Sequence, residues 1–238
     1  MSVISFVSSD RRTGCSMVAR CFAEGFVKKD PGKTAILLCC SDDWFPGPGE
    51  DGLSFSDVAP YAEKELTDFD EILERSRVED GLSVIFPFRP GEFRRLGIQQ
   101  TEVFISRLSK MYSLVVCDLG CISAPGRMPA AALVSDRVFE VLSSGEVCIR
   151  KHEWLCGLYE KLGICFDGYI LNGTDRESYY TPEEVRKRLG APRERFFSVR
   201  RSAFSQSAEA EGLSLLHYRD RGFAKDIYSL ISSICFDI

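Results

Sequence analysis

The segment between residues 8 and 17 has the position and some of the residue types of a phosphate-binding loop. It follows the apolar run Val3–Val7 and precedes a helix-like segment, and the start of a helix after a strand is where backbone amides bind phosphate. On the template G-x-x-x-x-G-K-[ST], the positions run from Ser9 to Ser16, and only Gly14 and Ser16 match. Taken alone, this match is weak, and a purely structural strand-to-helix turn explains it better.

The elements that would position this loop follow from the distribution of apolar residues. Apolar runs of strand length alternate with segments whose apolar residues recur every three or four positions, which is typical of a mostly parallel sheet covered by helices. We therefore predict an α/β, three-layer fold with helices on both faces of the sheet, as a single domain over residues 1–238. The strand-like runs are Val3–Val7, Ala35–Cys40, Leu82–Phe86, Leu114–Cys117, Arg137–Leu142, Gly168–Leu171 and Phe196–Val199. The helix-like segments are Met17–Phe26, Val103–Met111, Trp154–Leu162, Pro182–Leu189 and Phe223–Ile234.

Charge and hydropathy exclude several function classes. The chain has 30 Lys and Arg against 35 Asp and Glu, so its net charge of -5 provides no general attraction for nucleic acid or an anionic membrane. Its longest apolar run, Ala35–Cys40, is too short to cross a bilayer, and its first residues do not resemble a signal peptide. We therefore expect a cytoplasmic protein.

The cysteines and histidines give no indication of a metal or redox centre. The ten cysteines are scattered, lie mostly in apolar runs and include no C-x-x-C pair, so we interpret them as reduced core residues. His152 and His217 are the only histidines, and no cysteine and histidine cluster is present, so we expect no structural zinc site.

Beyond the loop, the order of segments resembles that of the MinD/ParA family of deviant P-loop ATPases over nearly the whole chain. Asp42 and Asp43 follow the second strand-like run, at the place of the family's acidic switch loop. Asp118 follows an apolar strand in a segment similar to the family's Walker B motif, and Asn172 ends a strand similar to the one whose asparagine contacts adenine. The layout is most similar to the CpaE/TadZ-like branch, which is associated with pilus assembly and polar placement. The resemblance implies a P-loop NTPase fold, with ATP and Mg²⁺ as ligands in active members.

The loop departs from the family where phosphate would bind. Asp10 takes the position of the family's signature lysine, Cys15 takes that of its phosphate-binding lysine, and Arg11 and Arg12 replace glycines. Arginine disfavours the positive φ and the close backbone approach that glycine allows. A carboxylate about 4 Å from a phosphate oxygen costs about 4 kcal/mol at an effective dielectric constant near 20. A neutral cysteine cannot supply the charge that lysine gives the transition state. We therefore predict a degenerate loop with little or no hydrolysis.

The other candidate residues each have a functional and a structural interpretation. Ser16 and Asp118 could hold Mg²⁺ if a nucleotide binds, or could be a first-turn helix residue and a loop cap. Asp42 and Asp43 could be catalytic in an active enzyme, or could form a solvated acidic loop. Asn172 could contact a base, or could be a turn residue. The predicted vestigial or weak nucleotide site consists of Ser9, Asp10, Arg11, Arg12, Thr13, Gly14, Cys15, Ser16, Met17 and Asn172.

Cys15 has a further interpretation as a reactive thiol. A thiol at a helix N-terminus beside Arg11 and Arg12 has the electropositive surroundings that lower a thiol pKa. We favour the simpler explanation, a lysine replacement in a loop that no longer binds phosphate.

These observations predict a pseudo-ATPase that acts as a scaffold or localisation factor. We expect it to work through protein partners, as a homodimer across the former nucleotide face, in spatial organisation or assembly of a cell-envelope machine such as a pilus, without a bound cofactor. The alternative is an active Mg-ATP-dependent dimerisation switch in which Arg11 or Arg12 replaces the lysines. The last helix lacks the lysines of a membrane-targeting tail, so we expect no direct membrane anchor, and we expect no nucleic-acid partner.

Overall fold

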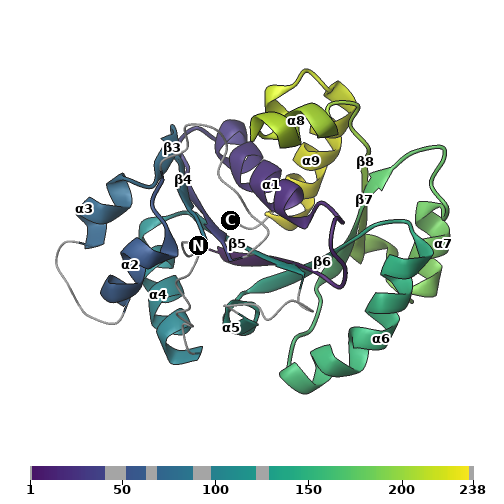
Figure 1. Ribbon diagram of the computed structural model, residues 1–238, viewed down its shortest axis with the longest axis horizontal. Coiled ribbons are helices and arrows are strands. Elements are labelled where there is room, and N and C mark those ends of the chain that lie inside the picture. Colours follow the sequence, from purple (N-terminus) through teal and green to yellow (C-terminus); the bar gives the residue numbers. More distant parts are fainter. Residues whose placement is uncertain (1, 41–51, 63–68, 88–97, 122–128, 236–238) are drawn as a thin grey trace.

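The strands of the protein form one mostly parallel sheet (Figure 1). The computed structural model describes residues 2–40, 52–62, 69–87, 98–121 and 129–235. The strands are β1 (Ser2–Ser8), β2 (Ala35–Cys39), β3 (Arg77–Glu79), β4 (Leu82–Ile85), β5 (Leu114–Cys121), β6 (Arg137–Leu142), β7 (Gly168–Thr174) and β8 (Phe196–Arg200). Their order in the sheet is β3-β4-β2-β5-β1-β6-β7-β8, and the pairing of β3 with β4 is antiparallel whereas the other pairs are parallel. Every predicted strand-like run is a strand.

Helices cover both faces of this sheet, as predicted. The helices are α1 (Cys15–Lys29), α2 (Phe55–Ala62), α3 (Phe69–Glu74), α4 (Ile98–Met111), α5 (Pro129–Leu133), α6 (Glu146–Leu162), α7 (Pro182–Arg188), α8 (Ser205–Glu211) and α9 (Arg221–Ile234), and the 3₁₀ turns are η1 (Arg193–Arg195) and η2 (Leu215–His217). Residues of α1 and α9 share one hydrophobic core with one face of the sheet, and residues of α4, α5 and α6 share a second core with the other face. Figure 1 shows α1 and α9 on one side of the sheet and α4, α5 and α6 on the other. The three-layer α/β prediction is confirmed.

The central strand β1 shows how the two cores are built. Ile4 and Phe6 belong to the core with α1 and α9, whereas Val3 and Val7 belong to the opposite core, because successive side chains of a strand point to opposite faces. The ring of Phe6 packs edge-on against that of Phe22 on α1, with centroids 5.2 Å apart. A strand buried on both faces holds the residues that follow it in a fixed position.

Two helices show where the sequence pattern succeeds and where it fails. Helix α7 begins with the predicted Thr181 cap, which forms a complete capping box with Glu184. Helix α6 is also present, but the apolar residues with helical spacing in its predicted segment are not all buried. Trp154 is 79% exposed, Leu158 44% and Leu162 42%, because a different set of α6 residues faces the core. That set consists of Cys148, Ile149, His152, Leu155 and Tyr159.

No helix in the described ranges is long and apolar enough to cross a bilayer. All ten cysteines lie in the described ranges, where none forms a disulfide. Most are buried, whereas Cys165 is exposed.

Candidate functional site

The loop between β1 and α1 lies at the carboxyl edge of the parallel strands, where open α/β sheets bind ligands. Gly14 precedes the helix with φ of 79°, and in the described part of the chain no side chain caps this helix end. A Cβ atom at this position would lie 2.2 Å from Asn172 Nδ2, so the loop requires glycine there for space as well as for φ. Arg12 also has a positive φ, 59°, in place of the family's glycine.

Side-chain hydrogen bonds fix the conformation of the loop. Ser8 Oγ donates to the carbonyl oxygen of Asp10 (2.8 Å), and Thr13 Oγ1 donates to Ser8 Oγ (2.9 Å). Asn172 Nδ2, at the carboxyl end of β7, donates to the carbonyl oxygen of Thr13 (2.8 Å). The structure therefore brings Asn172 to the predicted loop, where its amide braces the backbone.

Cys15 and Asp118 are buried together where the family template has a lysine and a metal-holding aspartate. Cys15 is 6% exposed, and Asp118, on β5, is fully buried. Burial, followed by the charge of Asp118 and its hydrogen bond with the thiol, raises the pKa of Cys15 well above its usual value. The interpretation of Cys15 as a low-pKa thiol in electropositive surroundings is therefore wrong, because burial and the Asp118 carboxylate both raise its pKa.

We expect Cys15 to resist alkylation in the native protein. A buried thiol with a raised pKa forms little thiolate, whereas Cys165 is exposed. Brief treatment with iodoacetamide, read by peptide mass spectrometry, should modify Cys165 and leave Cys15 unmodified, and both should react in urea. Native alkylation of Cys15 at the rate of Cys165 would contradict the buried Cys15 and Asp118 pair.

The charge of Asp10 is compensated from outside the loop. Its carboxylate accepts a hydrogen bond from Lys151 Nζ on α6, which raises the pKa of Lys151. Arg11 and Arg12 are exposed. The Lys151 ammonium therefore offsets the repulsion expected between the Asp10 carboxylate and an anion at the loop. Sequence analysis missed Lys151, since nothing in the spacing connects residues 10 and 151.

Behind the loop lies a buried polar network. Ser9 Oγ donates to Glu140 on β6 and lies 2.7 Å from the hydroxyl oxygen of Tyr159. Glu140 Oε2 lies 2.6 Å from His152 Nδ1, and His152 Nε2 lies 3.3 Å from Cys156 Sγ. Burial and the charge of Glu140 raise the pKa of Tyr159 above its usual range. The network anchors the start of the loop to β6 and α6. The sequence signal that could have revealed it was a single acidic residue, Glu140, within the otherwise apolar run 138–142.

The remaining predicted residues fall into two groups. Ser16 is half-buried in the first turn of α1, and Met17 packs against the core shared by α1 and α9. Asp42 and Asp43, the predicted switch residues, lie outside the described residues.

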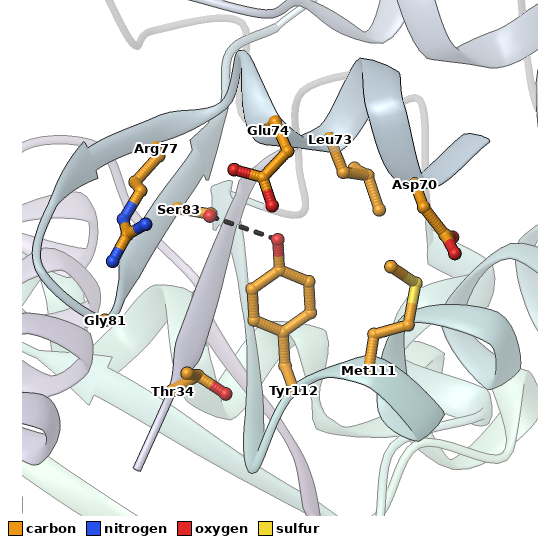
Figure 2. A pocket seen from close by; sticks show the side chains of 9 residues that line it. All are labelled: Thr34, Asp70, Leu73, Glu74, Arg77, Gly81, Ser83, Met111 and Tyr112. Atoms are coloured by element: carbon orange, nitrogen blue, oxygen red, sulfur yellow. Dashed lines mark hydrogen bonds between the residues drawn. The ribbon is translucent and has the colours of Figure 1, made fainter. Parts of the chain in front are cut away.

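A separate cavity of about 400 Å³ lies at the opposite, amino edge of the sheet (Figure 2). Three of its lining residues lie just before strands. Thr34 directly precedes β2, Gly81 directly precedes β4, and Tyr112 lies two residues before β5. Tyr112 donates a hydrogen bond to Ser83 Oγ (3.1 Å), and Figure 2 shows the Glu74 carboxylate pointing toward the Tyr112 hydroxyl. No residue of the loop lines this cavity.

Comparison with known proteins adds information about the fold. No family model and no curated protein matches the sequence. The ParA family ATPase from Chlorobium tepidum TLS superposes with a TM-score of 0.78 at 16% identity, over 97% of this chain and 98% of that chain. A chain of the MinC:MinD cell division protein complex from Aquifex aeolicus superposes with a TM-score of 0.76 at 14% sequence identity, over 100% of this chain and 97% of that chain. MinD from Pyrococcus horikoshii OT3, complexed with Mg-ADP, superposes with a TM-score of 0.70 at 15% sequence identity, over 98% of this chain and 95% of that chain.

The fold is that of the MinD and ParA ATPases. At these identities the likeness establishes the architecture, so the chemistry has to be argued from the residues at the loop.

Proposed function

We propose that this protein is a MinD/ParA-like pseudo-ATPase that acts as a scaffold or localisation factor through protein contacts. The observation that carries the proposal is the buried contact between Cys15 and Asp118. A neutral thiol in the lysine position cannot stabilise charge on a transferring phosphoryl group. Asp118 Oδ1 also accepts a hydrogen bond from the Gly120 amide (3.1 Å), so this carboxylate is already engaged by the protein.

The proposed partner surface is the exposed apolar side of α6. Val147, Trp154, Leu158 and Leu162 are 64%, 79%, 44% and 42% exposed, and they recur at helical spacing on the side of α6 that faces away from the core. Exposed apolar side chains that gather on one side of a helix favour an interaction site, and Lys151, 48% exposed, lies between Val147 and Trp154 on that side. We call these four residues the α6 stripe.

The occupant that we propose for the α6 stripe is a second copy of the chain. Trp154 lies midway between Val147 and Leu162, so antiparallel pairing across a two-fold axis would place Trp154 against its equivalent and each end of the stripe against the other end. Lys151 of the same helix reaches Asp10 in the loop, so the stripe adjoins the former nucleotide face. The homodimer would therefore use both surfaces. The proposed process, organisation or assembly of a cell-envelope machine such as a pilus, is supported by the resemblance to the CpaE/TadZ-like branch.

Thermal unfolding with nucleotide tests the pseudo-ATPase proposal. A ligand present at about 100 times its Kd stabilises a protein by about 2.7 kcal/mol, which for this size raises Tm by roughly 5–10 °C. We expect no shift with millimolar Mg-ATP or Mg-ADP and no release of phosphate from ATP. A shift with Mg-ATP that is lost in Ser16→Ala would contradict the proposal and favour the active dimerisation switch.

A further inference from the structure

Three potential metal ligands from distant parts of the chain meet near the amino edge of the sheet, away from the loop. Glu24 lies on α1, Glu79 ends β3, and His217 ends η2. One ligand atom from each lies within 4.8 Å of the other two. His217 Nε2 is 3.2 Å from Glu79 Oε1 and 3.8 Å from Glu24 Oε1. Two ligands of a tetrahedral zinc ion at about 2.0–2.1 Å from the metal are about 3.3 Å apart, so the spacing is close to that of a metal site.

The cluster already holds a cation. The Lys28 ammonium pairs with Glu24 and lies 3.9 Å from Glu79 Oε2. Burial opposes the charge of Lys28, but the hydrogen bond and charge of Glu24, together with Glu79, raise its pKa. The Glu24 side chain is only 2% exposed. A carboxylate buried to this extent requires a nearby positive charge, and here that charge sits on the end of a flexible side chain.

We propose that Glu24, Glu79 and His217 form a binding site for a divalent transition metal ion of the zinc class, which binds by displacing the Lys28 ammonium. A divalent ion would balance two carboxylates where Lys28 balances only one charge. The imidazole nitrogen selects zinc-like ions over Mg²⁺ and Ca²⁺, which prefer oxygen ligands.

Access to this site is open. The side chains of His217, Lys28 and Glu79 are 38%, 37% and 33% exposed, so an ion can enter from solvent and a water molecule can provide the fourth ligand. The bound ion would connect α1, the antiparallel edge of the sheet and the turn before α9. An ion that binds only the folded state stabilises that state, so the bound ion would crosslink these elements and stabilise the fold. The ligands are too far apart in the sequence for their spacing to reveal them.

Metal titration of the full chain tests the site. After removal of metals with EDTA and dialysis, we expect one equivalent of Zn²⁺ to bind in calorimetry, Co²⁺ to give tetrahedral visible absorption, and Zn²⁺ to raise the unfolding midpoint. Lys28→Met removes the competing charge and should tighten Zn²⁺ binding by about tenfold. His217→Gln should weaken it by at least about tenfold, as should Glu79→Gln.

Lys29→Met is the matched control. Lys29 neighbours Lys28 on α1 but bonds to Ser232 instead of the cluster, so its replacement should change the Zn²⁺ Kd by less than about twofold. Circular dichroism verifies that each variant is folded. Absence of stoichiometric Zn²⁺ binding in both the wild type and Lys28→Met would overturn the proposal. Binding that neither His217→Gln nor Glu79→Gln weakens would also overturn it, by placing the ion elsewhere, for example on a cysteine.

Discussion

Glu140→Ala is expected to lower the free energy of unfolding by about 3–5 kcal/mol. Glu140 is fully buried on β6, accepts a hydrogen bond from Ser9 and lies 2.6 Å from His152 Nδ1. Alanine would deprive Ser9 Oγ and His152 Nδ1 of this buried hydrogen-bond partner. It would also leave a cavity, and both effects are destabilising. Urea unfolding monitored by circular dichroism measures the change.

Two variants control this experiment. Glu140→Gln retains the volume and one acceptor oxygen, so it should lose less than about half as much stability. Glu160→Ala removes an exposed carboxylate from α6 and should change stability by less than about 0.5 kcal/mol. If Glu140→Ala cost no more than Glu160→Ala, the buried network would not stabilise the fold.

This network marks a limit of what the sequence can predict. The run Arg137–Leu142 was predicted as a strand because most of its residues are apolar, and Glu140 inside it did not alter that prediction. Its partners Ser9 and His152 lie 131 and 12 residues away along the chain. Ser9 reaches Glu140 because β6 lies beside β1 in the sheet. The order of strands in a sheet cannot be predicted from the local periodicity of the sequence.

The larger elements were predictable for a physical reason. Central strands of a parallel sheet are buried on both faces, so they appear as continuous apolar runs, and the covering helices have apolar residues at steps of three and four. The short elements α2, α3, α5, α8 and β3 were not predicted, because few residues define each of them. At the site, Gly14 was predicted from the phosphate-loop template, and Cys15 and Asn172 were predicted from the resemblance. The three residues lie together. Lys151 was not, because its contact with the loop depends on how α6 packs.

Helix α6 was correctly predicted as a helix, but its apolar spacing does not identify its buried side. Its apolar residues fall on two sides of the helix, and Leu155 and Tyr159 on one side belong to the core. Trp154 and Leu158 on the other side contribute to the helical spacing that predicts the helix, but they are exposed. A period of 3.6 residues identifies a helix, but it does not say which apolar side faces the sheet when both sides are apolar. A second apolar side with no covering element among the described residues favours a contact outside the chain.

Trp154→Glu is expected to dissociate the proposed homodimer. Tryptophans near the centre of an interface commonly contribute 2 kcal/mol or more, so the dimer Kd should rise by at least about 30-fold, further if the glutamate is buried opposite its equivalent. Because Trp154 is 79% exposed, the change should leave the fold intact, with the free energy of unfolding of the monomer altered by less than about 0.5 kcal/mol. Sedimentation velocity over a range of protein concentrations measures the association directly.

Val103→Glu on α4 provides the matched control for this substitution. Val103 is 52% exposed and apolar, but α4 packs beneath β1 and β5, away from α6, as Figure 1 shows. The same charge introduced there should leave the dimer Kd unchanged, so an effect confined to Trp154→Glu assigns the contact to the α6 stripe. Equal weakening by both variants would point to a general effect of added negative charge. A dimer that persists in Trp154→Glu would restrict the contact to the former nucleotide face, and a wild-type protein that stays monomeric would require the α6 stripe to bind a different partner.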